Sequence, residues 1–173
     1  DHGQGYFDQY RGMPAQLVID QIKVLRDKYH CRHFLFSDES YPPALFKKVS
    51  QLLVDQDVGI KWTTLIRFEE TLQDQTTWDL AAKVGCCTLY YGMESANERV
   101  LTLMDKHAKK DVIQRNLQMA AKAGIWNHVM AFYGFPSETF DEAMETRQFV
   151  LDNQPVIHSL ELFYFVAYRH TPM

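Results

Sequence analysis

The chain has 173 residues, of which 46% are apolar and 13% aromatic, and its 18 basic and 22 acidic side chains give a formal charge of −4. This size and apolar content allow a large core, which excludes an intrinsically disordered or fibrous protein. Lys and Arg are scattered along the chain, so it lacks the basic face that binds duplex DNA. We expect a single domain over residues 1–173 and no DNA partner.

Neither the cysteines nor the apolar runs are typical of a secreted or membrane protein. Cys31, Cys86 and Cys87 are odd in number and irregular in spacing, which gives no disulfide framework and favours a reducing cytosol. The most apolar stretch contains Glu161 and is much shorter than the about 20 residues of a transmembrane helix. We expect a cytoplasmic protein without a membrane span.

Apolar residues alternate between helical and strand periodicity along the whole chain. Val18, Ile22 and Leu25 recur at helical spacing, and the short apolar run after them is typical of a buried parallel strand. In chain order, the pattern predicts a helix over 14–29, a strand over 33–36, a helix from 42 to 53, a strand over 60–66, a helix over 77–84, a strand over 87–91, a helical region over 100–123 interrupted near 106–107, a strand over 129–133, a helix through 149–150 and a strand over 159–167.

Two pairs of residues have the spacing of a capping box, in which a hydroxyl and a carboxylate three residues apart satisfy the first amides of a helix. These pairs are Ser95 with Glu98 and Thr139 with Glu142. We expect a helix to begin after each.

Helices that alternate with strands predict an α/β fold with a parallel sheet and right-handed crossovers. A closed eightfold barrel takes about 250 residues, so the chain is either an open doubly wound sheet or part of a barrel. Ligands bind at the carboxyl ends of the strands in both architectures.

Polar residues follow each predicted strand: Asp38 and Glu39, Arg67, Glu94 and Ser95, Glu138, Tyr168 and Arg169. Such a rim offers carboxylates for hydroxyl or ammonium groups and an arginine for a carboxylate, as a zwitterionic small molecule carrying a sugar would require. Asp38, Ser40 and Ser95 fit equally well as helix caps, and Arg67 as a solvated charge.

Other chemistries lack support in the sequence. No pair of His or Cys residues has the spacing of a zinc site, and there is no Gly-rich phosphate loop, Walker lysine or G-x-S-x-G elbow. We therefore expect no metal ligands within this chain.

Four segments, in order, give the sequence a resemblance to a known family. They are FLFSDES at 34–40, YGMES at 91–95 with Arg99, Val100, Leu101 and Lys106 after it, YGFPSET at 133–139, and YRHTP at 168–172. This series resembles the radical S-adenosylmethionine (SAM) superfamily, and within it the cobalamin-binding-domain branch of radical methyltransferases and the anaerobic oxidative cyclase of chlorophyll synthesis.

The resemblance implies a partial TIM-type barrel, (β/α)6-like with its first strand missing, in which a [4Fe-4S] cluster cleaves SAM to methionine and a 5′-deoxyadenosyl radical. The cofactor carries the chemistry and the protein orients it. Cobalamin is a candidate further cofactor, and the substrate is a small molecule or a peptide. By position, the resemblance assigns Asp38, Glu39 and Ser40 to the methionine amino group, Arg67 to its carboxylate, Glu94 and Ser95 to the ribose, the strand over 129–134 with Phe132 and Gly134 to the adenine, and Tyr168 and Arg169 to the substrate end. Ser37 and Gly92 are further expected cofactor contacts.

The sequence departs from the family in one respect, because the C-x-x-x-C-x-x-C loop that binds the cluster is absent. Residues 10–11 and the helix after them resemble the segment that follows this loop. We therefore expect the loop and a first strand upstream, in a longer polypeptide. The alternatives are a cluster-free barrel kept as a binding or scaffolding module, and an unrelated parallel α/β enzyme that uses Glu94 and Glu138 as acid and base.

Overall fold

The structure is a computed structural model that describes residues 12–37, 41–106 and 108–167. Its elements are, in chain order, α1 (Ala15–Tyr29), β1 (His33–Phe36), α2 (Pro43–Asp55), β2 (Lys61–Ile66), the 3-10 helix η1 (Glu70–Leu72), α3 (Gln75–Lys83), β3 (Cys86–Glu94), α4 (Glu98–Leu103), α5 (Lys110–Lys122), β4 (Trp126–Tyr133), α6 (Phe140–Asp152) and β5 (Ser159–Tyr164). No helix in the described ranges is both long enough and apolar enough to cross a membrane.

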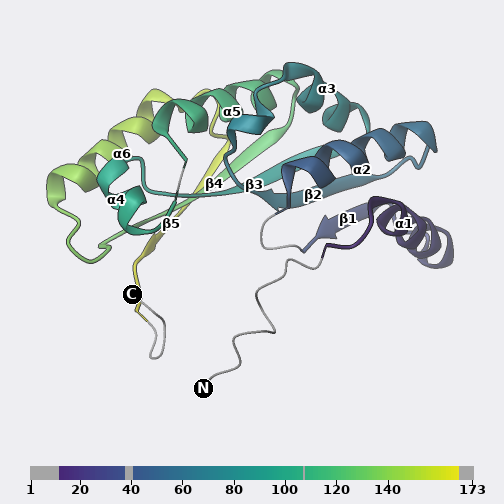
Figure 1. Cartoon of the computed structure of the whole chain (residues 1–173), viewed down its shortest axis with the longest axis horizontal. Coiled ribbons are helices and arrows are strands. Elements are labelled where there is room, and N and C mark those ends of the chain that lie inside the picture. The colour runs from purple at the N-terminus through teal and green to yellow at the C-terminus, as the bar shows by residue number, and fades with distance from the viewer. Residues whose placement is uncertain (1–11, 38–40, 107, 168–173) are drawn as a thin grey trace.

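The five strands form one parallel sheet in the order β1-β2-β3-β4-β5. Strands that are consecutive in sequence are neighbours in space, and right-handed crossovers between them place all the helices on one face. Figure 1 shows this helical layer along one side of the twisted sheet. The predicted parallel α/β fold is confirmed, and within the described residues the sheet is open, with β1 and β5 at its edges.

Side chains on β3 show how the two faces differ. Leu89, Tyr91 and Met93 point toward the helices and are buried in the core, whereas Tyr90 and Gly92 alternate with them on the opposite face. We call that opposite face the inner face; its residues include Leu65, Tyr90, Gly92, His128, Met130 and Glu161, which strand register and contacts place together.

Large aromatic side chains fill the core between the sheet and the helices. The ring of Phe46 on α2 lies 5.6 Å from that of Trp62 and 5.8 Å from that of Trp78. Both indole N–H groups are satisfied, because Trp78 donates to the carbonyl of Leu72 and Trp62 to that of Val84. These bonds let two amphipathic rings enter the core without an unpaired donor.

The structure corrects several details of the expected elements. The strand over 33–36 is an edge strand rather than a buried one, because Leu35 is 64% exposed. The capping box at Ser95 and Glu98 does not form: Asn97 caps α4 by accepting from the amide of Val100. The strand predicted over 87–91 extends to Glu94, because Gly92 and Glu94 still pair with β4.

The remaining helix boundaries lie within two residues of the predicted ones, whereas the strands predicted over 129–133 and 159–167 are observed as Trp126–Tyr133 and Ser159–Tyr164. Thr139 and Glu142 form a capping box at the start of α6. The helical region over 100–123 is interrupted as expected, since α4 ends at Leu103 and α5 begins at Lys110.

Candidate functional site

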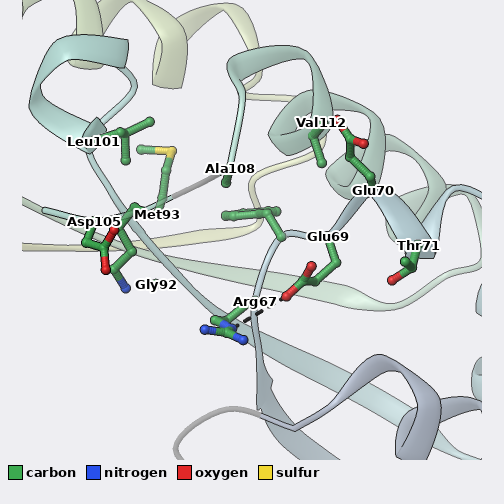
Figure 2. Close-up of a pocket in the computed structure, with 12 residues that line it drawn as sticks. Arg67, Glu69, Glu70, Thr71, Gly92, Met93, Leu101, Asp105, Ala108 and Val112 are labelled. Carbon is green, nitrogen blue, oxygen red and sulfur yellow. Dashed lines mark ion pairs between the residues drawn. The ribbon is translucent and has the colours of Figure 1, made fainter. Parts of the chain in front are cut away.

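A cavity of about 530 Å³ lies beside the carboxyl ends of β2 and β3 (Figure 2). Its polar lining includes Arg67 and Lys106, and Met93, Leu101 and Val112 contribute apolar surface. Small-molecule sites in proteins have volumes of about 300–1,000 Å³ and combine an apolar lining with a few polar groups. This cavity has the size and composition of a ligand site.

Glu94 is the last residue of β3, and its carboxylate lies over the backbone of Gly92. A β-bulge shifts the strand register between these two residues, and Glu94 takes a left-handed backbone conformation with φ of 63°. A Cβ atom at position 92 would lie 2.6 Å from Glu94 Oε1, so a side chain there would displace this carboxylate. Lys106 Nζ donates to the same oxygen at 3.2 Å. The bulge and the lysine together fix one carboxylate at the strand end.

Arg67 follows β2 directly, and its side chain is 66% exposed. Its Nε atom lies 3.5 Å from Glu69 Oε1, a pair that Figure 2 shows at the cavity. An exposed ion pair of this length contributes little to stability. The guanidinium can therefore leave Glu69 and turn toward an anionic ligand at little cost in free energy.

The segment after Arg67 is held in place by Asn116, which is fully buried on α5. Its side-chain oxygen accepts from the amide of Glu69 at 3.0 Å, and its amide nitrogen donates to the carbonyl of Leu72 at 3.3 Å. These two bonds tie η1 to α5 and fix one wall of the cavity.

Ser95 lies beneath the site, not on its surface. It is fully buried, its hydroxyl is 3.0 Å from that of Thr146, and it accepts from the amide of Asn97 at 3.1 Å. In the structure Ser95 supports the turn that follows Glu94.

At the end of the next strand, Gly134 has φ of 83° and its amide donates to Glu138 Oε2 at 2.6 Å. Phe132 packs with Phe165 at a centroid distance of 5.7 Å. Glu138 is therefore engaged by the backbone of its own turn. Phe132 and Gly134 lie one strand away from the cavity wall formed by Gly92.

The structure disperses the predicted site residues. Arg67 and Gly92 line the cavity, Glu94 lies beside it as the partner of Lys106, and Ser37 lies exposed after the end of β1. The residues outside the described ranges are Asp38, Glu39, Ser40, Tyr168 and Arg169. Sequence reasoning did not assign Lys106, although it was part of a quoted motif, and it did not find Glu69 or Asn116, for which the sequence carries no signal.

The cysteines of this chain do not fit an iron–sulfur cluster at the site. Cys86 and Cys87 begin β3, and Cys31 precedes β1, so all three lie toward the end of the sheet opposite the cavity. Burial raises the pKa of the Cys86 thiol well above its ordinary value, which disfavours the thiolate that binds iron. Among the described residues, no group of three His, Cys, Asp or Glu side chains could hold a metal ion.

A family model described as the radical SAM superfamily matches residues 2–150. This chain belongs to the radical SAM superfamily. It is 25% identical over 154 residues to the anaerobic magnesium-protoporphyrin IX monomethyl ester cyclase of Rubrivivax gelatinosus, a match covering 87% of this chain and 27% of that protein. It is 27% identical over 145 residues to an uncharacterized methyltransferase of Pyrococcus horikoshii, covering 82% of this chain and 31% of the relative.

Solved structures agree with this assignment at the level of the fold. The radical SAM methyltransferase TsrM from Kitasatospora setae, with tryptophan and a SAM analogue bound, superposes with a TM-score of 0.73 at 15% identity, covering 86% of this chain and 30% of TsrM. A second TsrM structure holds cobalamin and a [4Fe-4S] cluster, with a TM-score of 0.70, 14% identity and coverage of 86% and 31%. The radical SAM chain thus has the partial-barrel α/β fold and spans about a third or less of these enzymes.

Proposed function

We propose that this chain is the SAM-binding core of a radical enzyme, with the ligands of a [4Fe-4S] cluster supplied by cysteines outside these 173 residues. The observation that carries the proposal is the cavity at the ends of β2 and β3, which Arg67 and Lys106 line and beside which Lys106 holds Glu94. A zwitterion joined to a sugar needs a cationic fork and an acceptor carboxylate at such a site. SAM, when bound, supplies the carbon–sulfur bond whose cleavage yields the 5′-deoxyadenosyl radical.

Each residue has a role that its chemistry supports. Arg67 binds the methionine carboxylate, because its guanidinium is exposed and only loosely paired. Glu94 accepts hydrogen bonds from the ribose hydroxyls, while Gly92 leaves room for this carboxylate over the strand. Further proposed contacts are Ser37, Asp38, Glu39 and Ser40 to the amino group, Phe132 and Gly134 to the adenine, and Tyr168 and Arg169 at the substrate end.

Methyl transfer and oxidative cyclisation are the outcomes that the relatives favour, with cobalamin as a further cofactor in a longer polypeptide. The Pyrococcus relative is named a methyltransferase, the Rubrivivax relative a cyclase, and TsrM binds cobalamin. We propose a small-molecule or peptide substrate and a cytoplasmic location.

SAM binding to this chain tests the site directly. We expect Arg67→Met and Glu94→Gln each to raise the Kd for SAM on the order of tenfold, because each removes a charge-assisted hydrogen bond. Isothermal titration calorimetry measures the effect. Glu98→Gln is the matched control, since it removes an exposed carboxylate from the nearby α4 and leaves the Kd unchanged. Equal affinity for all four proteins would place SAM elsewhere.

Anaerobic reconstitution tests the radical chemistry in a polypeptide that extends upstream of this chain. We expect about four irons per cluster, and release of 5′-deoxyadenosine when SAM and a reductant are added. A folded protein that neither assembles a cluster nor cleaves SAM would favour the alternative of a cluster-free binding or scaffolding module. The acid–base alternative predicts that SAM binding is indifferent to Glu94, and it is disfavoured by the engagement of Glu138 with Gly134.

A further inference from the structure

A second polar group lies on the inner face, centred on His128 of β4. Its Nδ1 atom is 2.8 Å from the hydroxyl of Ser159 on β5, and its Nε2 atom is 3.4 Å from Glu161 Oε2 on the same strand. The ring of Tyr90 on β3 packs against the imidazole at a centroid distance of 4.7 Å. Three neighbouring strands thus hold one imidazole in a single orientation.

The hydrogen bonds around His128 place a proton on Nε2. Trp126 Nε1 donates to the hydroxyl of Ser159 at 2.9 Å, which leaves the Ser159 proton available to donate to Nδ1. Nε2 faces a carboxylate, so a bare lone pair there would be repelled. Nε2 makes no hydrogen bond to a described residue, but it lies 3.4 Å from Glu161 Oε2, and its N–H attracts that carboxylate electrostatically, which positions it.

Glu161 is the member of this group that a ligand can reach. Its side chain is 50% exposed, while His128 is 20% exposed. One oxygen, Oε2, faces the imidazole, and the second oxygen offers further acceptor sites. The register partner of Glu161 is Met130, and Phe163, 48% exposed, is two residues further along β5 on the same face. The carboxylate is thus framed by apolar and aromatic side chains.

This group lies close to the cavity described above. Gly92 lines the cavity and pairs with Met130, which in turn pairs with Glu161. Two strand spacings of about 4.8 Å therefore separate the backbone of the cavity wall from that of Glu161, about 10 Å in all. A molecule lying across the inner face from Glu161 would reach the SAM site.

We propose that the inner face at β3, β4 and β5 binds a planar nitrogen heterocycle through its ring N–H, with Glu161 as the acceptor and His128 as its positioning residue. An anionic acceptor between flat apolar side chains complements a flat ligand with a polarised N–H donor. The inference rests on the proposed function only in identifying this ligand as the substrate. The binding site itself stands on the geometry of the three strands.

Indole and benzofuran test the acceptor, because they share size and shape and differ in the ring N–H. We expect indole to bind this chain on the order of five- to tenfold more tightly, with chemical-shift changes at β4 and β5 in amide spectra. Glu161→Met should abolish the preference, and Asp152→Asn, which removes an exposed carboxylate at the end of α6, should keep it. Equal affinities in the wild type, or shifts confined to the helical layer, would overturn the proposal.

Variants of His128 test the positioning role. His128→Gln keeps an N–H near the place of Nε2 and should retain most of the indole preference, whereas His128→Leu should lose it. The ¹⁵N spectrum of the wild-type imidazole should show a protonated Nε2, and a neutral ring protonated only at Nδ1 would contradict the arrangement. SAM affinity should be unchanged in both variants. If indole shows no preference while SAM still binds, this inference is refuted and the proposed function is not. The SAM affinities of the Arg67 and Glu94 variants test only the proposed function.

Discussion

Glu94 combines a carboxylate held by Lys106 with a backbone conformation that L-amino acids avoid. Its φ of 63° places it in the left-handed region, which costs a non-glycine residue about 1–2 kcal/mol. Such strain persists where the surroundings impose it, and it concentrates at functional sites. Here the bulge at the end of β3 and the ion pair with Lys106 impose it.

Two substitutions at this position separate strain from charge. Glu94→Gly and Glu94→Ala both remove the carboxylate, but glycine relieves the backbone strain, so we expect Glu94→Gly to have a free energy of unfolding about 1 kcal/mol higher than Glu94→Ala. Urea denaturation measures the difference. At the exposed Gln118 of α5 the order should reverse by a similar amount, because glycine is the poorer helix former there. The same order at both positions would show that position 94 is unstrained.

Single residues of the site were predictable to the extent that they directly follow an apolar run. Arg67 does so and lines the cavity, and Glu94, three residues after the predicted strand, pairs with the cavity residue Lys106. Asn116 was not predictable, because its contact with Glu69 joins residues 47 positions apart. Pairing of Lys106 with Glu94 depends likewise on how α4 turns the chain back, which no local pattern specifies.

Two turns that join a helix to the next strand require glycine for a structural reason. Gly85, between α3 and β3, has φ of 88°, and a Cβ there would lie 2.0 Å from the carbonyl oxygen of Ile60. Gly124, between α5 and β4, has φ of 83° and no atom within 4 Å of a built Cβ. The two positions share a backbone conformation and differ in whether other atoms occupy the place of a Cβ atom.

Alanine substitutions at these two glycines should therefore differ in cost. Gly124→Ala costs about 1–2 kcal/mol, because alanine is strained in the left-handed backbone conformation. Gly85→Ala has the same strain and also a clash with the backbone of Ile60, which cannot move without displacing β2. We expect the free energy of unfolding to fall by at least about 2 kcal/mol more for Gly85→Ala, measured by urea denaturation. Equal costs would mean that β2 can shift away from this turn.

Helices and strands were predictable at their centres, and less so at their ends. Apolar periodicity located all five strands, although only β2, β3 and β4 contribute fully buried side chains to the core. It did not show that β3 continues to Glu94, since that extension depends on pairing with β4. Asn97, not Ser95, caps α4, because burial against Thr146 engages the Ser95 hydroxyl. Tertiary contacts therefore decide boundaries that local sequence leaves open.

For the whole molecule, periodicity predicted the layer of helices over a parallel sheet but could not choose between an open sheet and part of a barrel. The order of four motifs made that choice, and the superfamily match agrees with it. The inner-face group of Tyr90, His128 and Glu161 was not predicted, because it depends on the register of three strands. Consecutive right-handed crossovers place the cavity and this group within reach of each other.

Acid stability of the molecule should depend on the contact that joins α4 to α6. Arg99 of α4 donates to both carboxylate oxygens of Glu142 and to the carbonyl of Ser137. Its hydrogen bond to Glu142, followed by the amide of Thr139, lowers the pKa of that carboxyl from 4.5 to about 2. Because the folded-state pKa lies below the unfolded one, this contact stabilises the protein fully above about pH 4.5 and is lost as the pH falls toward about 2.

Comparing wild type with Glu142→Gln across this range isolates the contact. We expect the variant to unfold at a lower urea concentration near neutral pH, and the difference to shrink steadily between about pH 4.5 and about pH 2, because the protonated wild-type carboxyl no longer pairs with Arg99. Asp141→Asn removes a carboxylate from the same turn of α6 and controls for net charge. If wild type and Glu142→Gln lost stability in parallel, the ion pair would not join the two helices in solution, and the turn after β4 would depend on the capping box alone.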